Sequence, residues 1–192
     1  MSPSLNAETS PTSAKIDATT LESLSWYALR VRSRNEKKVA VLLQGKGIEI
    51  SLPLKQITRL WSDRQKLIWE PLFQGYVFTR IPFQARRFEV LQTTGAVAFC
   101  GIGGKIKAVP DEQMYWLEKL LSADEDIRLE REFPAGTRVR VTRGPWLGIE
   151  GIVQQARENA RLVIWLDGLQ QGVSVNMNAS LLQSLNREHQ IK

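Results

Sequence analysis

The sequence predicts an α+β protein in which a domain of strands and helices precedes a small β-barrel. Residues 24–122 alternate between strand-like and helix-like apolar patterns, whereas residues 133–187 contain only short runs of β-branched residues. A stretch rich in Asp and Glu, residues 123–132, separates these regions and predicts an acidic linker. The length of 192 residues is sufficient for two small domains.

The first domain is expected to open with a strand and a helix. In the segment SWYALRVR, residues 25–32, apolar and polar side chains alternate, which predicts a half-buried strand. Ser33 and Glu36 follow at the spacing of a capping box, which predicts the start of a helix. The apolar stripe of that helix is expected to end at Gly45.

The rest of this domain alternates between short strands and helices. A basic segment with two tryptophans, RLWSDRQKLIWE at 59–70, has no assigned element. Pro110 is expected to open the last helix, with acidic residues in its first turn. The other predicted elements, in order, are a strand at 48–54, a strand at 76–81, a short helix at 88–94 and a short strand at 96–100.

The second domain is predicted to be a barrel of four or five short strands. The runs GTRVRVTRG, GIEGIVQQA, ARLVIWL and QGVSVNM are separated by Gly, Asn or Asp. QQARENARL, residues 154–162, contains good helix formers, but we interpret it as a hairpin that turns near Glu158 and Asn159. Residues 1–23, rich in Ser, Thr, Ala and Pro, are expected to be a disordered tail, and residues 188–192 a polar tail.

The positive charge is concentrated in one part of the chain. The net charge is +6, and residues 26–66 hold ten Lys or Arg residues against three acids. Between residues 111 and 132 the balance reverses, with eight acids against three bases. A concentration of like charge attracts a polyanion, so the pattern favours nucleic-acid binding. A solvated basic face is the alternative.

The sequence lacks the combinations of residues that form catalytic or metal sites. The only histidine, His189, lies in the polar tail, and a single cysteine, Cys100, excludes a cysteine cluster. The loop GIGGK, residues 101–105, lacks the Ser or Thr of a phosphate loop. We therefore predict no enzyme, metal or cofactor. Without an apolar signal segment or a long apolar run, the chain is expected to be cytoplasmic and not membrane-bound.

Four motifs, in the same order along the chain, resemble the NusG family of transcription elongation factors. These factors combine an NGN domain with a KOW barrel. The resemblance implies an antiparallel NGN sheet flanked by helices at 24–122 and a KOW barrel at 133–187. The motifs are WYALRVRSRNEKKVA (26–40), EPLFQGYVFTRI (70–81), TTGAVAFCGIGGKIKAVPDEQM (93–114) and GTRVRVTRGPWLGIEGIV (136–153).

The resemblance implies a site for RNA polymerase. The NGN domain of the family binds the clamp helices through a hydrophobic depression on its sheet. Phe73 and Tyr76, on either side of Gly75, match the signature that contributes to this depression. We interpret the pair as facing the partner, since aromatic side chains bury a large area at low entropic cost. The alternative is that Phe73 packs in the core.

The resemblance also implies contacts to upstream duplex DNA or to the displaced non-template strand. Such contacts to phosphates add affinity without sequence choice. The alternative is that some of these side chains only make a helix soluble. The candidates are Arg30, Arg32, Arg34, Lys37, Lys38, Arg86 and Arg87.

In the KOW domain, Gly144, Pro145 and Trp146 match the family's turn with an aromatic at its tip. The family uses this region to bind the termination factor Rho or a small-subunit ribosomal protein. An exposed tryptophan at a loop tip favours a contact site. Packing of Trp146 inside the barrel is the alternative.

Within the family, the segments IEISLPL and WSDRQK resemble the specialised antiterminators of the UpxY and RfaH type. The function implied is an elongation and antitermination factor that bridges the polymerase clamp and suppresses pausing or termination at particular operons, of the polysaccharide kind. A general NusG that couples polymerase to Rho or the ribosome is the alternative. A KOW-type RNA-binding module of the ribosome is a further one.

Overall fold

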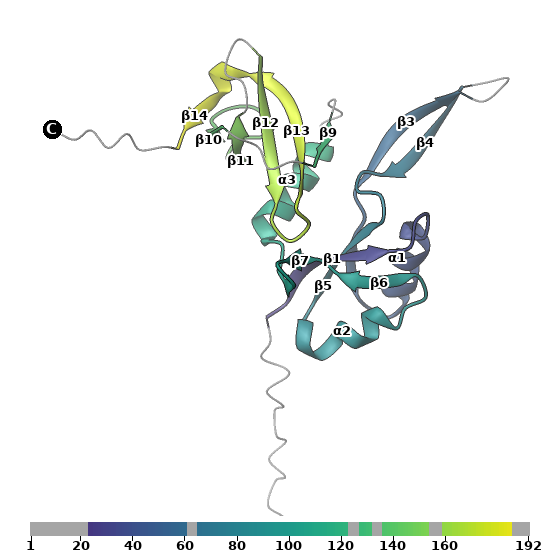
Figure 1. The fold of residues 1–192 in the computed structure, drawn as a ribbon. Coiled ribbons are helices and arrows are strands. Elements are labelled where there is room, and N and C mark those ends of the chain that lie inside the picture. The colour runs from purple at the N-terminus through teal and green to yellow at the C-terminus, as the bar shows by residue number, and fades with distance from the viewer. Residues whose placement is uncertain (1–22, 61–64, 123–126, 132–135, 154–158, 186–192) are drawn as a thin grey trace, which may run out of the picture.

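The computed structural model describes residues 23–60, 65–122, 127–131, 136–153 and 159–185 (Figure 1). The predicted polar tail and all but the last residue of the predicted disordered tail lie outside these ranges. The elements are β1 (Ser25–Val31), α1 (Glu36–Gly45), β2 (Glu49–Ser51), β3 (Leu54–Leu60), β4 (Gln65–Pro71), β5 (Tyr76–Ile81), α2 (Phe83–Leu91), β6 (Ala96–Phe99), β7 (Gly101–Ile102), β8 (Lys105–Ile106), α3 (Asp111–Leu121), β9 (Arg128–Glu130), β10 (Thr137–Val141), β11 (Glu150–Val153), β12 (Asn159–Leu166), β13 (Gln171–Asn178), η2 (Ala179–Leu181) and β14 (Leu182–Ser184).

The first domain is built on a four-stranded antiparallel sheet with the strand order β2-β5-β1-β6. Successive side chains of a strand point to opposite faces, so every second residue of β1 and β5 lies on the same side. Leu29 and Val77, which are register partners, are fully buried on one face. They pack in a hydrophobic cluster with Val39 and Leu43 of α1 and Val90 of α2. The two helices therefore cover this face of the sheet.

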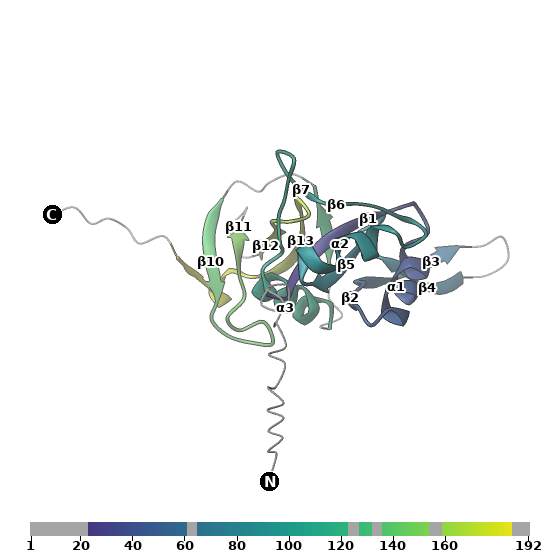
Figure 2. The same cartoon turned by 90° about the horizontal axis from the view of Figure 1, so that it is seen from below.

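The opposite face of the sheet is covered by α3 and by the barrel. Ala28 and Phe78, register partners on this face, are fully buried. Their hydrophobic cluster includes Leu117 of α3 and continues into Leu162 and Leu166 of β12. Figures 1 and 2 show α3 between the sheet and the barrel. The two domains thus share one continuous core across their boundary.

The barrel confirms the predicted fold class and contains one strand more than expected. Its six strands have the order β14-β10-β11-β12-β13-β9. β11 and β12 pair antiparallel, which agrees with a hairpin for residues 154–162, although the turn at 154–158 lies outside the described residues. Asn159 already belongs to β12. β9 comes from the segment that the sequence predicted to be an acidic linker.

The described residues of the basic segment lie in a hairpin that projects from the body: residues 59–60 end β3, and residues 65–70 belong to β4. β3 and β4 pair over seven residues, from Leu54 opposite Pro71 to Leu60 opposite Gln65. Within the described residues they join no other sheet, and both views show them extending away from the domain (Figure 2). Sequence patterns predicted a strand at 48–54 in this region, where the structure has the short β2 and then the start of β3.

Candidate functional site

The signature turn between β4 and β5 is held from two sides. Gly75 has a φ of +82°, a left-handed conformation that favours glycine. Its N–H donates to a carboxylate oxygen of Glu36 at 2.7 Å, and its carbonyl accepts from the N–H of Val31 at 2.8 Å. The turn is therefore fixed to both β1 and α1, and its position depends on the start of that helix.

This contact replaces the predicted capping box. Glu36 is buried with 6% exposure, and its carboxylate is turned to Gly75 instead of to the backbone at the helix start. Asn35 occupies the N-cap position without a side-chain cap, and its amide donates to the carbonyl of Ser33. The capping-box prediction is wrong because a tertiary contact takes the glutamate.

Phe73 is not exposed to a partner in this structure. Its side chain is 1% exposed and meets Phe78 edge to face, with ring centroids 5.7 Å apart and planes at 80°. The core alternative therefore describes Phe73, and the favoured partner-facing interpretation does not. Tyr76 is half-buried and lines a groove of about 530 Å³ with Leu129 and Gln171 of the barrel side. Both side chains are shielded from solvent because α3 and the barrel cover the sheet face that carries them.

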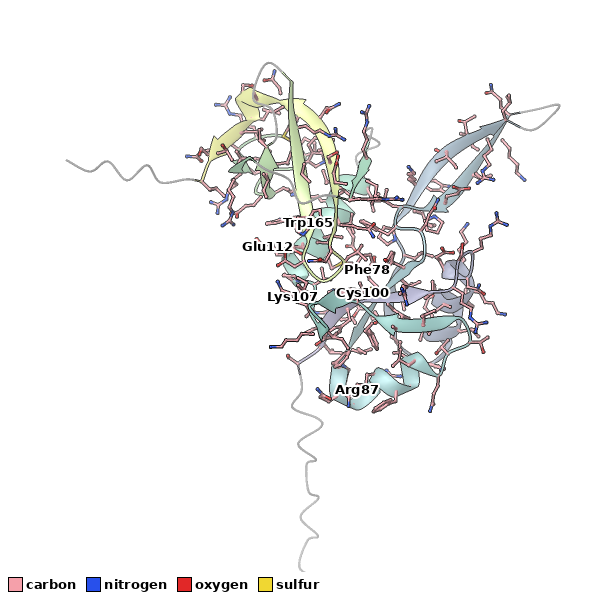
Figure 3. The ribbon with its side chains drawn as sticks, in the orientation of Figure 1. Phe78, Arg87, Cys100, Lys107, Glu112 and Trp165 are labelled. Atoms are coloured by element: carbon pink, nitrogen blue, oxygen red, sulfur yellow. The ribbon has the colours of Figure 1, made fainter. Side chains whose placement is uncertain are left out.

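The tip of the β12–β13 hairpin makes polar contacts to the first domain. Asp167 accepts a hydrogen bond from the Lys107 ammonium at 3.0 Å, and its N–H donates to the side-chain oxygen of Gln113 at 3.2 Å. A Cβ added to Gly168 would lie 2.7 Å from the Lys107 carbonyl oxygen and 2.8 Å from a methyl of Val109. In the view of Figure 3 this tip lies near the labelled Phe78 and Cys100. Leu169 of this turn is buried in the same hydrophobic cluster as Phe73 and Phe78.

The predicted nucleic-acid-binding cations divide into two groups. Those at the end of β1 and the start of α1 are exposed: Arg30, Arg32, Arg34, Lys37 and Lys38. The ammonium of Lys37 donates to the carbonyl oxygen of Trp69 at 2.8 Å, which ties α1 to the hairpin. A groove of about 570 Å³ between these elements is lined by Arg34, Lys37 and Arg59, among others. Of the five, Arg34 and Lys37 line this groove, whose lining also includes Glu36 and Glu70, whereas Arg30 follows Ala28 on the opposite face of β1.

Arg86 and Arg87, on α2, have structural contacts instead. The Arg86 guanidinium donates to Glu89 at 2.7 and 2.9 Å and to the carbonyl of Lys46 at 2.8 Å, at the end of α1. Its hydrogen bond holds the pKa of the Glu89 carboxyl below its ordinary value. Arg87 lies over the Phe88 ring at 4.7 Å. That these two side chains face DNA stays a prediction.

In the barrel turn, Gly144 and Pro145 are exposed, whereas Trp146 is buried with 6% exposure. Trp146 belongs to the cluster shared with α3, so packing is the interpretation that the structure supports. Leu147, which the sequence analysis did not select, is 58% exposed, and its carbonyl accepts from Lys119 at 3.2 Å. The exposed apolar residue of the turn is therefore the neighbour of the tryptophan.

Sequence reasoning also missed the residues that cover the sheet face. Asp167, Gly168 and Leu169 form a hairpin turn whose composition resembles that of many surface turns. The one available signal was Leu169, an apolar residue in the middle of a turn, which the structure buries in the shared cluster.

The described part of the chain contains no group of three or more His, Cys, Asp or Glu residues placed to hold a metal ion. None of its helices has both the length and the apolar character needed to span a membrane.

Comparison with known proteins identifies the first domain. Residues 24–118 match the family model described as "Transcription termination factor nusG". The chain is 20% identical over 176 residues to the transcription termination/antitermination protein NusG of Borreliella burgdorferi. The alignment covers 80% of this chain and 96% of the relative. The transcription termination/antitermination protein NusG of Pasteurella multocida is 24% identical over 175 residues, and that alignment covers 84% of this chain and 95% of the relative.

A solved structure described as "Domain interaction in Thermotoga maritima NusG" matches 85% of this chain and 98% of its own, with 21% identity and a TM-score of 0.48. The first domain, residues 24–118, therefore belongs to the NusG family.

Proposed function

We propose that this protein is a transcription elongation and antitermination factor that binds RNA polymerase through the sheet face of its first domain. On this view Phe73, Gly75 and Tyr76 contribute to the site for the clamp helices, and bridging of the clamp suppresses pausing or termination. The observation that carries the proposal is the apolar character of this face. Without α3 and the barrel, Ala28, Phe73 and Phe78 would be an exposed apolar patch, and such patches mark interaction sites.

The barrel has to move before polymerase can bind there. Phe73 and Phe78 are buried in the cluster that also holds Leu166 and Leu169 of the barrel. A protein helix cannot reach these rings while they are buried in this cluster. The arrangement described here is therefore a closed state, and its population reduces the apparent affinity for polymerase.

Tyr76 provides the test of the site. We expect Tyr76→Ala to weaken binding to core RNA polymerase about 30-fold, the effect of losing an aromatic hot spot of roughly 2 kcal/mol. The variant is measured in a chain that also carries Gly168→Ala. The added methyl group is expected to displace the barrel, so any contribution of Tyr76 to closure does not affect the result. Biolayer interferometry with immobilised polymerase gives the affinities.

Tyr115→Ala in the same background is the matched control, because Tyr115 is an exposed tyrosine on α3, outside the proposed site. Equal affinities for the Tyr76 and Tyr115 variants would show that polymerase binds elsewhere.

The same assay with an elongation complex tests the DNA contacts. Arg34→Gln/Lys38→Gln should reduce the salt dependence of binding by about 0.7–0.9 per lost phosphate contact, and Lys105→Gln/Arg143→Gln, exposed cations elsewhere, should not.

We propose further that the factor serves particular operons and that the barrel binds Rho or a ribosomal protein through Gly144, Pro145 and the exposed Leu147. The resemblance of two segments to the specialised antiterminators supports the first part. The distribution of the protein along the genome, compared with that of RNA polymerase, decides it. Confinement to one or a few long operons is the expected result. Occupancy that follows polymerase over most genes would mean a general factor instead.

A further inference from the structure

One face of the projecting β3–β4 hairpin carries large apolar side chains that are exposed to solvent. In an antiparallel pair, residues directly opposite each other lie on the same face. Thr58 is opposite Leu67, so their face also holds Leu60 and Trp69, each two residues further along its strand. Leu60 is 79% exposed, Leu67 62% and Trp69 55%. The described residues of this face include no charged side chain. We call Leu60, Leu67 and Trp69 the apolar strip.

The other face of the β3–β4 hairpin is charged and lies towards α1. Arg59 and Glu70 form an ion pair at 2.6 Å on this face, and both line the groove that Lys37 of α1 also lines. The hairpin thus has one basic side and one uncharged, apolar side, and an exposed apolar patch of this kind marks an interaction site. The charged side chains of the basic side are Lys55, Arg59, Lys66 and Glu70.

The base of the hairpin is fixed to the first domain. The Lys37 ammonium donates to the carbonyl oxygen of Trp69 at 2.8 Å, and the N–H of Leu72 donates to the carbonyl oxygen of Pro53 at 2.8 Å. β4 leads through the signature turn directly to Tyr76, the first residue of β5. The strip and the proposed clamp-helix site therefore belong to one domain. Since a strand of seven residues is about 20 Å long, a single large partner can contact both.

The strip differs from the clamp-helix site because it is exposed in the closed arrangement, whereas Phe73 and Phe78 are buried. We propose that the apolar strip is a second docking surface for RNA polymerase, which binds it before the barrel moves. Contact through the strip raises the effective concentration of polymerase at the covered face and offsets the cost of opening. This inference rests on the proposed function.

The charges of the hairpin indicate the chemistry of its partner. Its described residues carry three cations and one acid, so the complementary surface on polymerase is apolar with acidic residues at its rim. A second copy of this chain is disfavoured, because two hairpins side by side would bring their cations together. A nucleic-acid strand is also disfavoured, because it needs cations on the face that it contacts.

The test changes the strip and measures binding of the full-length chain to core RNA polymerase without nucleic acid. For Leu60→Gln/Leu67→Gln we expect the association rate constant and the affinity both to fall about ten-fold or more, because the first contact is lost. Biolayer interferometry with immobilised polymerase gives both values. If circular dichroism shows that this variant does not fold, Leu60→Gln alone replaces it.

Val41→Gln/Phe88→Gln is the matched control. These apolar residues are 66% and 61% exposed on α1 and α2, which cover the other face of the sheet, so this variant should bind like the wild type. Equal binding by the strip variant and the control would overturn the proposal. A loss that occurs only when nucleic acid is present would assign the strip to DNA instead. A dimeric wild type and a monomeric strip variant in sedimentation would assign it to a second copy, and each of these results also overturns the proposal.

The proposed function is tested separately. It fails if Tyr76→Ala and Tyr115→Ala bind polymerase equally in the Gly168→Ala chain, whatever the strip variant does. The docking surface fails alone if Tyr76→Ala weakens binding there and Leu60→Gln/Leu67→Gln does not weaken binding of the closed chain.

Discussion

Phe73→Ala is expected to lower the free energy of unfolding by about 3–5 kcal/mol, the usual cost of removing a buried phenylalanine ring. The ring is 1% exposed and packs edge to face on Phe78, so its removal leaves a cavity that the surrounding strands cannot fill by small movements. Domains of this size are stable by about 5–15 kcal/mol, so the loss is a large fraction of the total. Urea unfolding followed by circular dichroism measures it.

Phe88→Ala is the matched control. Phe88 is 61% exposed on α2, where the Arg87 guanidinium covers one face of its ring, and we expect a change of at most about 1 kcal/mol. If Phe73→Ala were as mild as this control, the Phe73 ring would be exposed in solution and the partner-facing interpretation would return. The expected instability also explains why Phe73 is a poor choice for testing polymerase binding, and why Tyr76 is preferred.

Local patterns predicted much of the fold. The alternation in residues 25–32 and the apolar stripe after Ser33 correspond to β1 and α1, and the four β-branched runs correspond to strands of the barrel. These features depend on residues close together in the sequence, where the period of the apolar side chains determines the element. The fold class followed from a change in the apolar pattern: strand-like and helix-like segments alternate in the first domain, whereas short runs of β-branched residues follow residue 133.

The environment of the site was less predictable because it depends on distant residues. Phe73 is buried by a cluster that includes Leu166 and Leu169, more than ninety positions later in the chain. Arg86 appears as a free cation in the sequence, yet its partners include backbone carbonyls at the end of α1. Glu36 fits a local capping pattern, but the N–H of Gly75 takes its carboxylate. In each case a tertiary contact overrides a local preference.

The predicted acidic linker is a further case in which a contact to distant residues determines the structure. A run of acids is ordinarily a solvated segment, and nothing in residues 123–132 identifies a strand. Glu130 nevertheless finds Ser174 and Arg161, which lie on two adjacent strands of the barrel. Composition describes the average behaviour of such a segment, whereas the pairing of β9 depends on complementarity at one edge.

Gly168→Ala is expected to shift the chain from the closed arrangement to an open one. The new methyl group would lie 2.7 Å from the Lys107 carbonyl oxygen and 2.8 Å from Val109, both in the first domain. Such overpacking costs about 1–3 kcal/mol, equivalent to a factor of roughly 5–150 in the closed population. The φ of Gly168 is not in the left-handed region, so alanine is compatible with the hairpin itself and the barrel should stay folded.

Cys100, the single cysteine of the chain, reports the opening. Burial raises the pKa of its thiol to about 11, and it packs against the cluster that the barrel shares with the sheet. At pH 8 a thiol with this pKa is about one part in a thousand thiolate, against about one part in four for an ordinary cysteine of pKa 8.5. Opening should return the pKa towards its ordinary value. We therefore expect alkylation by iodoacetamide to become faster in Gly168→Ala, by up to about 200-fold if the chain opens fully.

Gly45→Ala is the control, because a Cβ at Gly45 has no atom within 4 Å and meets neither domain. Small-angle X-ray scattering gives an independent reading, since separated domains have a larger radius of gyration. An unchanged alkylation rate and an unchanged radius in Gly168→Ala would mean that the hairpin tip does not hold the domains together. If the chain opens and also binds polymerase more tightly, the barrel competes with polymerase for the face that carries Tyr76. If it opens without any gain in binding, the covered face is a domain interface and the polymerase site lies elsewhere.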